Sequence, residues 1–477
     1  MSKCPACGAE LAYNIKDEKV FCEYCKSTFD PKELELGEKY SKNVETFEGK
    51  GYSCRQCGAT LLTFDETAIT FCSYCGSQAV IEANMVKINK PDYVIPFKKT
   101  KEECINEYKK VIKNALFVPN YMKDAVTVEK FRGIYMPYAV FKTSFHGLSS
   151  NTGKKYSHRL GDYVYYNLYD IKAQVDAEFD GISYDVLSKF YDEYSGGIPF
   201  DYNGAEPFNK NYLLGFYADT KDVEADIYDD NVEDITTDAS SSQLSKRREF
   251  SKYGCTNPKV KLRVTDRKMG MFPVYFLAIR DKENKIHYAV VNGQTGKVAA
   301  DLPIDFKKYI IGTLLLSLIF IIILNMGSVI LPKTVLIFSL IASIMGMIIS
   351  NSQLNKIFIR DKKLDDEGYV SVNGTNEEVD TKNKFVYYVN GVKKYKYKMP
   401  FKEKKKYLFK YLIPLIIGLL VLALNPVDDE YYYITAIVSF IIIIISFKDL
   451  VKEHNMLTSN KLPQLEKRGG DNYEKYQ

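Results

Sequence analysis

Eight cysteines in two identical patterns constrain the fold of this chain more than any other feature. Each set reads C-x2-C-x14-C-x2-C, and each cysteine of the second set follows its counterpart by 50 residues. Such a repeat indicates an internal duplication. The first set is Cys4, Cys7, Cys22 and Cys25, and the second is Cys54, Cys57, Cys72 and Cys75.

The spacing of these cysteines predicts two metal sites. Two residues between cysteines let both sulfur atoms face one ion from a tight turn, and 14 residues suffice for a short antiparallel hairpin that joins the two pairs. Gly8, Gly58 and Gly76 follow three of the closing cysteines, where the backbone often needs a positive φ, and Lys26 stands in the fourth turn. We therefore predict two β-rich zinc ribbons holding two zinc ions. Four thiolates leave no position for water or substrate, so both sites would be structural.

Other uses of paired cysteines were weighed against zinc. Disulfides would need an oxidising compartment, but no apolar signal segment follows the first methionine. A thioredoxin-like redox pair needs one C-x2-C within a βαβ unit, not four in β-rich surroundings. Four thiolates can also hold an iron–sulfur centre, which stays open as the alternative metal. Without a metal, each segment is too small to bury a core.

The charge of the cysteine-rich region bears on its partner. Residues 1–90 contain 11 Lys and Arg against 13 Asp and Glu, so they carry −2, which becomes −6 with two four-thiolate zinc sites. Because a phosphate-binding surface needs a basic stripe, this count disfavours nucleic acid and favours a protein partner. Tyr24 and Tyr74, which lie between paired cysteines where side chains often point outward, are the candidate partner-binding residues. Phe21 and Phe71 are expected inside the small ribbon cores.

Residues 91–305 are predicted to form a soluble α+β domain. Thr100 and Glu103 form a capping box at the start of a helix that carries Cys104 on its apolar face, as a core thiol. Stretches 133–145 and 163–179 have the composition of β-strands.

No catalytic motif is recognisable in the chain. The glycines before Lys297 lack the spacing of a phosphate-binding loop and lie between predicted strands. The four histidines form no cluster with Ser, Asp or Glu. We therefore expect a protein that is not an enzyme.

Four apolar segments dominate the last third of the chain. Residues 309–325, 333–350, 407–425 and 431–447 are 17–19 residues long. At about 1.5 Å per residue they match a hydrocarbon core of roughly 30 Å. They predict four transmembrane α-helices in two hairpins, rather than buried helices of a soluble core, because polar loops separate them. No Asp, Glu or His lies within them, which disfavours a transporter.

The loops between these segments predict their orientation. Residues 326–332 and 426–430 contain no Lys or Arg, whereas residues 351–406 contain 14. The positive-inside rule then places both termini and the basic loop in the cytosol, in a multi-pass protein of the cell membrane. A β-hairpin turning at Asn390-Gly391 is predicted within that loop. Its lysines would face anionic headgroups or guard a strand edge.

These expectations divide the chain into seven parts. They are zinc ribbon 1 (1–45), zinc ribbon 2 (46–90), a cytosolic α+β domain (91–305), a first transmembrane hairpin (306–350), a basic cytosolic loop with a β-hairpin (351–406), a second transmembrane hairpin (407–447) and a cytosolic tail (448–477).

Several sequence stretches carry a family resemblance. They are CPACGAEL, CRQCGATL, VIPFKKTKEEC (94–104), GIYMPYAVF (133–141), YLLGFYAD (212–219) and VVNGQTGKVAADLPID (291–306). In these stretches the chain resembles bacterial multi-pass membrane proteins with an N-terminal transcription-factor-B-type zinc ribbon, a group without an assigned function. The resemblance implies an architecture and no activity.

The expected function is that of a membrane-anchored zinc-ribbon adaptor or scaffold. It would be held in the lipid bilayer and would bind another protein through its cytosolic domains without enzymatic activity. A membrane-tethered binder of nucleic acid or of the transcription machinery is the first alternative, and a small-solute transporter is the second.

Overall fold

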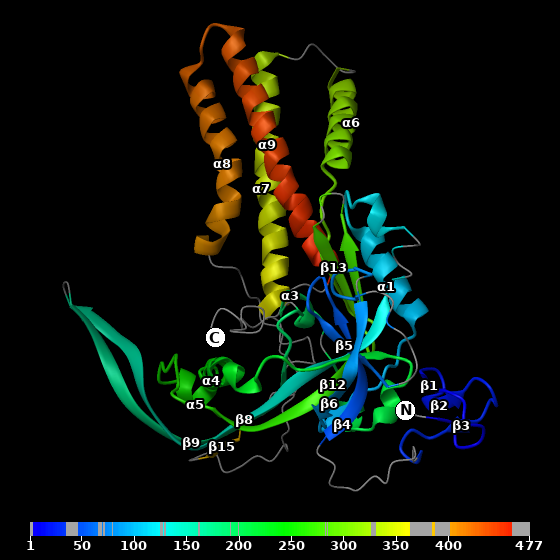
Figure 1. Ribbon diagram of the computed structural model, residues 1–477. Helices are drawn as coiled ribbons and strands as arrows, with labels where there is room; N and C mark the ends of the chain where they lie inside the picture. The colour runs from blue at the N-terminus through cyan, green and yellow to red at the C-terminus, as the bar shows by residue number, and fades with distance from the viewer. Residues whose placement is uncertain are drawn as a thin grey trace.

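The computed structural model describes most of the chain. It covers residues 3–34, 46–362, 384–386 and 401–459, apart from short gaps at 65–68, 70–71, 79, 125–126, 128–129, 161–162, 191, 199, 282, 284 and 326–330. The described residues form a small N-terminal sheet, a large sheet with flanking helices, and a group of long apolar helices at one end (Figure 1). This confirms a multidomain chain with a large β-sheet domain.

The first cysteine set lies on a small antiparallel sheet of its own. Its strands are β1 (Leu11–Asn14), β2 (Lys19–Cys22) and β3 (Thr28–Phe29), with Leu11 opposite Cys22. The sheet docks on the rest of the molecule where the Tyr13 amide donates to the carbonyl of Leu214 over 3.0 Å. The 14-residue spacer therefore forms the short hairpin that the spacing predicted.

One large sheet forms the centre of the molecule. Its strand order is β10-β7-β12-β8-β11-β5-β4-β6, with β9 and then β15 added beside β8, and β13 and then β14 added beside β12. The strands are β4 (Thr46–Cys54), β5 (Thr60–Thr63), β6 (Val80–Asn89), β7 (Tyr93–Val94), β8 (Arg132–Leu160), β9 (Tyr163–Asp185), β10 (Glu206–Pro207), β11 (Tyr217–Asp219), β12 (Arg263–Arg280), β13 (Ile286–Asn292), β14 (Val298–Ala300) and β15 (Lys384–Val386).

The strands around the second cysteine set belong to this large sheet. β5 pairs with β11, with Leu62 opposite Ala218, and β4 joins β5 to β6. Backbone hydrogen bonds thus connect residues 46–90 to the region that follows them. The boundary at residue 90 stays a prediction, and the sheet continues on both sides of it.

Helices cover parts of this sheet. α1 (Lys101–Asn114) begins with the predicted capping box, since the Glu103 amide donates to the Thr100 hydroxyl and the Thr100 amide to the Glu103 carboxylate. Its buried side chains Cys104, Tyr108 and Ile112 recur every four residues and pack into the core. The other helices are α3 (Asp192–Ser195), α4 (Asp229–Leu244) and α5 (Arg248–Ser251), with short 3-10 turns at Asn120–Met122, Tyr202–Gly204, Lys210–Leu213 and Ala225–Tyr228.

The long apolar helices agree in part with the predicted spans. Of the helices α6 (Phe306–Asn325), α7 (Pro332–Lys362), α8 (Phe401–Leu424) and α9 (Asp429–Thr458), three contain stretches long and apolar enough to cross a membrane. These stretches are Pro332–Ile357, Tyr407–Leu424 and Asp429–Thr458. The prediction of four spans is therefore not matched by the three that are found. The remaining segment, 309–325, coincides with α6, whose last side chains lie outside the described residues.

The packing of these helices also differs from two separate hairpins. α7 packs against both α8 and α9, while α6 stands apart from α7 in Figure 1. At Gly418 on α8, the Leu340 side chain of α7 comes within 2.5 Å of the place a Cβ would take. Small residues permit such close approach between apolar helices, so Gly418 allows α8 to pack closely on α7.

A polar junction fixes the apolar helices to the sheet domain. The Asn455 side chain near the end of α9 accepts from the Leu116 amide (2.8 Å) and donates to the Leu116 carbonyl (3.0 Å). Lys308 Nζ on α6 donates to the carbonyl of Val118 over 2.7 Å. The segment after α1 thus holds two of the long helices, and the sheet domain lies at one end of the helix group (Figure 1).

Candidate metal centres

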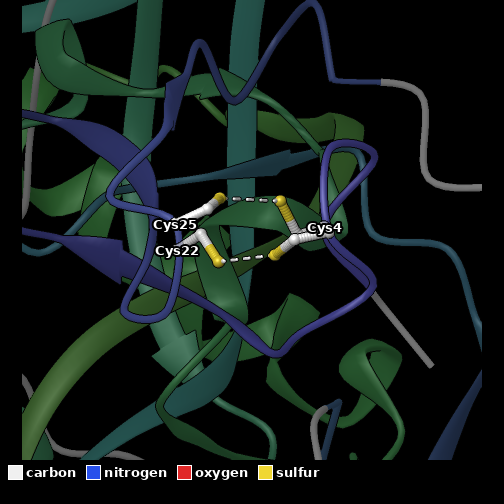
Figure 2. Close-up of side chains that lie close together, drawn as sticks. Cys4, Cys22 and Cys25 are labelled. Atoms are coloured by element: carbon white, nitrogen blue, oxygen red, sulfur yellow. Dashed lines mark hydrogen bonds between the residues drawn. The ribbon is translucent and has the colours of Figure 1, made fainter.

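The first four cysteines converge on one point. Cys4 Sγ lies 3.6 Å from Cys25 Sγ, Cys7 Sγ lies 3.5 Å from Cys22 Sγ, and all four sulfur atoms lie within 4.8 Å of one another. Figure 2 shows the side chains of Cys4, Cys22 and Cys25 turned toward the common centre. A tetrahedral metal–thiolate site with bonds of about 2.3 Å has sulfur–sulfur edges of about 3.8 Å, so the group fits such an ion.

The second four cysteines repeat this geometry. Cys54 Sγ lies 3.6 Å from Cys75 Sγ, and Cys57 Sγ lies 3.6 Å from Cys72 Sγ. The four sulfur atoms again lie within 4.8 Å of one another. In both groups the first cysteine is paired with the fourth and the second with the third. Both groups could therefore hold a metal ion.

Tight turns position the sulfur atoms. In each turn the residue after the closing cysteine donates its amide to the carbonyl of the opening cysteine, at 2.8 to 3.0 Å. That residue has a positive φ in all four turns: Gly8 (76°), Lys26 (61°), Gly58 (69°) and Gly76 (69°). The backbone conformation expected at the three glycines is confirmed, and Lys26 adopts it despite its Cβ.

The cysteines form no disulfide bonds, although their sulfur atoms lie close together. All ten cysteines are free, and separations of 3.5 to 3.6 Å exceed a disulfide bond of about 2.05 Å. A hydrogen bond from Cys72 lowers the pKa of Cys57 to about 5, and the same contact with burial raises the pKa of Cys72. Hydrogen bonds from Ser27 lower the pKa of Cys25 to about 6. A divalent cation would displace the protons held between these sulfur atoms and offset the negative charge of the thiolates.

The surroundings of the two centres differ. In the first, Cys4 and Cys22 are buried, Cys25 is half-buried and Cys7 is exposed, whereas in the second only Cys57 is half-buried and the other three cysteines are buried. Arg280 Nε on β12 also donates to the carbonyl of Cys75 over 2.8 Å. The first centre therefore reaches the surface at Cys7, and the second is more enclosed and lies beside the large sheet at the end of β4.

The two candidate partner-binding tyrosines lie in opposite environments. Tyr24 is 81% exposed, as expected of a side chain on a metal turn, whereas Tyr74 is only 3% exposed. The Tyr74 hydroxyl donates to the buried Asp219 carboxylate, and its ring packs on Phe276 at 5.2 Å between centroids. The expectation that Tyr74 points outward is therefore wrong, because β11 and β12 cover its turn. Phe21 is half-buried, and Phe71 lies outside the described residues.

Asp219 was not singled out from the sequence. It ends β11, is buried, and accepts from the amide of Thr220 as well as from Tyr74. Burial raises the pKa of this carboxyl to about 7, although both hydrogen bonds oppose the shift. Nothing in the surrounding stretch YLLGFYAD reveals that its aspartate meets a tyrosine from the second cysteine repeat.

Comparisons with known proteins add one relative. The chain is similar to a protein of Bacillus subtilis (strain 168) described as uncharacterized protein YdjG, with 26% identity over 311 residues. The match covers 64% of this chain and 91% of that protein. No family model matches the chain, and no solved structure matches it.

Proposed function

We propose that this chain is a membrane-anchored adaptor that binds another protein through its first cysteine centre. The observation that carries the proposal is the contrast between the two repeats: one is enclosed in the large sheet, and the other presents an exposed tyrosine beside its ligands. A turn stiffened by metal offers a rigid aromatic side chain, and tyrosine is enriched at protein interfaces.

Zinc is the proposed ion at both centres, in a structural role. Four sulfur donors in a closed tetrahedral arrangement suit zinc and leave no position for substrate. Iron could use the same donors, so elemental analysis of the purified full chain decides between them. Two zinc ions per chain without an iron–sulfur absorption band are expected. Iron in place of zinc would contradict the proposal.

Four spans with cytosolic termini are proposed as the anchor, with α6 as the first span. The sheet domain lies at one end of the helix group (Figure 1). Lys308 bonds to the Val118 carbonyl of that domain and Lys448 Nζ lies 5.8 Å from the ring of Phe306 at the start of α6, so basic residues flank the apolar stretches at the same end. Under the positive-inside rule this end faces the cytosol. A cysteine introduced at Asp428 should react with an impermeant reagent from outside the cell. One introduced at Thr375 should react only after permeabilisation.

A protein partner fits the first centre better than nucleic acid does. Residues 1–90 carry no excess of basic side chains, so phosphate contacts would contribute little attraction. The full chain in detergent should bind DNA or RNA more weakly than about 10 μM at physiological salt. Tight, salt-sensitive nucleic-acid binding would instead favour the alternative function.

Site-specific crosslinking tests the protein partner directly. A photoreactive phenylalanine analogue at Tyr24 of the full membrane chain should crosslink one defined protein in living cells. The same analogue at Met85, which is 54% exposed on β6 of the large sheet, is the control. Tyr24→Ala should abolish co-purification of the crosslinked protein while zinc content stays unchanged. Equal crosslinking from both positions, or capture that survives Tyr24→Ala, would overturn the proposal.

A further inference from the structure

The most prominent unassigned feature is a long two-stranded ribbon. β8 pairs with β12 as far as Ser144, and beyond that residue its ladder runs only along β9, to Leu160 opposite Tyr163. At about 3.4 Å per residue this part of β8 is about 50 Å long, and β15 pairs with β9 near its base, at Gln174–Asp176. In Figure 1 the ribbon leaves the sheet domain and curves back toward the end of the molecule that holds α6 to α9.

The inner part of the ribbon packs against the segment that precedes β12. Ser149 donates to the carbonyl of Lys259, and the backbone of Tyr253 lies against Gly153 with no room for a Cβ. Ile171 and Ala173 of β9 are buried on the same face. We call residues 154–168 the ribbon tip; its residues 161 and 162 lie outside the described part. Two paired strands alone are only marginally stable in water, so the tip would gain from a surface to pack against.

The ribbon tip exposes large side chains. Tyr156 is 60% exposed and Leu168 is 68% exposed, and Tyr165 and Tyr166 are exposed beside them. Tyr156 and Tyr166 are cross-strand neighbours, and Lys154 is opposite Leu168, so these four residues share one face of the ribbon. A face that exposes tyrosine and leucine beside a lysine, far from the core, indicates a contact surface.

The charge of the ribbon tip indicates which class of partner would bind it. The tip contains Lys154, Lys155 and Arg159 against the single acid Asp162, a net charge of +2. Lys154 Nζ lies 4.1 Å from the centroid of the Tyr166 ring, and Tyr165 stacks on His158 at 4.6 Å. Tyrosine beside lysine is the composition found where proteins meet lipid headgroups, with the ring in the interface and the ammonium near phosphate.

We infer that the ribbon tip is a second membrane contact, which binds the anionic headgroups of the bilayer in which the chain's own helices are anchored. The inference rests on the membrane anchoring proposed above, though not on the partner of the first centre. Because the anchor keeps the tip near one leaflet, even a weak contact is occupied most of the time. The contact would fix the sheet domain relative to the bilayer at a point distant from the junction at Asn455.

Fluorescence in nanodiscs tests this contact. The full chain, with a fluorescent amino acid in place of the exposed Asn167, is reconstituted with headgroup-labelled nitroxide lipid. One set of discs contains phosphatidylcholine alone, and the other contains 30% phosphatidylglycerol. Nitroxide should quench the fluorophore strongly in the anionic discs and weakly in the neutral ones. Because each basic residue changes binding to an anionic surface about five-fold, Lys154→Glu/Lys155→Glu should remove at least about four-fifths of the quenching.

Controls make each outcome decisive. Lys155→Glu alone spares the stacked Lys154 and should reduce quenching less. Lys261→Glu/Lys268→Glu makes the same charge change elsewhere and should leave quenching intact. Quenching absent from both kinds of disc, or equal in both and insensitive to the tip lysines, would overturn the inference. So would loss of quenching on adding cytosolic protein or RNA that binds the tip. Co-elution of the chain with the discs reports anchoring separately, and crosslinking at Tyr24 reports the proposed partner independently.

Discussion

The two cysteine repeats have the same ligand geometry and opposite roles in the fold. Their sulfur atoms pair in the same order at 3.5 to 3.6 Å, and their turns have the same hydrogen bonds. Yet the first repeat forms a separate three-stranded sheet, while the strands of the second join the large sheet. A metal-binding motif thus determines local geometry, and the residues around it determine whether it stays a separate module or becomes part of a core.

The contacts of each repeat explain the difference. The first repeat meets the body through polar contacts, such as the Asn209 and Asn211 amides on the carbonyl of Pro31 and an exposed Lys32–Glu206 ion pair, and through the Tyr13 ring, which lies 5.4 Å from that of Tyr212. Exposed ion pairs contribute only about 0–1 kcal/mol. The second repeat instead buries Tyr74 and three of its cysteines within the large sheet. Loss of metal should therefore have unequal consequences for the fold.

The largest expected effect is loss of one ligand in the second repeat. Cys72→Ser should destabilise the whole sheet domain by at least about 3 kcal/mol, because a structural metal site contributes directly to folding. Cys22→Ser, the matched change in the first repeat, should unfold residues 3–34 and leave the sheet domain folded. Hydrogen exchange and zinc content of the full chain in detergent measure both effects. Each variant should retain one zinc ion, and equal loss of protection in both would show that the repeats are equivalent.

The next largest effect concerns the buried tyrosine. Tyr74→Phe should cost about 3 kcal/mol of unfolding free energy, since it leaves the buried Asp219 carboxylate without its hydroxyl donor. Tyr24→Phe, at the equivalent position of the first repeat, should change stability by less than about 0.5 kcal/mol. Denaturant unfolding followed by a probe in the sheet domain distinguishes them. Similar costs for the two changes would mean that Tyr74 is not the core residue that its burial indicates.

Features with a local cause could be predicted from the sequence. Cysteine spacing predicted both four-sulfur groups, the Thr100–Glu103 pair predicted the start of α1, and strand composition placed β8 and β9. Apolar length likewise identified the three membrane-capable stretches. Each of these signals is contained within a few neighbouring residues or in a fixed spacing.

Features that depend on distant pairing could not be predicted. The pairing of β5 with β11 joins residues far apart in the chain, and no short pattern encodes it. The burial of Tyr74, its bond to Asp219 and the covering of the second centre all follow from that pairing. The repeated spacing suggested equal exposure of Tyr24 and Tyr74 because the sequence shows the duplication but not the strands that cover one copy.

A smaller effect should appear as a pH dependence. The pKa of Asp219 is raised above its ordinary value to about 7, so the neutral carboxyl stabilises the fold at low pH and that contribution is lost as pH rises toward 7. Asp219→Asn keeps an uncharged acceptor at this position. Relative to the wild type, it should therefore gain about 2 kcal/mol between pH 4 and pH 6. Comparing both proteins at each pH cancels the effect of acid on the zinc sites, and a constant difference across this range would contradict the shift.

The smallest effect compares the turns that close the two metal sites. Gly76 and Lys26 occupy equivalent places, each with a positive φ, and a Cβ at Gly76 would lie no closer than 3.7 Å to the nearest backbone oxygen. Gly76→Ala should therefore cost about 1 kcal/mol from backbone strain alone, without a clash. Lys26→Gly removes similar strain from the first repeat, but it also adds freedom to the unfolded chain and loses the ammonium 5.5 Å from the Phe21 ring. The gain from relieved strain and the two losses should nearly cancel, so the free energy of zinc binding should change by less than about 0.5 kcal/mol. Competition with a chelator measures this affinity. A tenfold gain in affinity on Lys26→Gly would show that the first repeat is held in a strained turn.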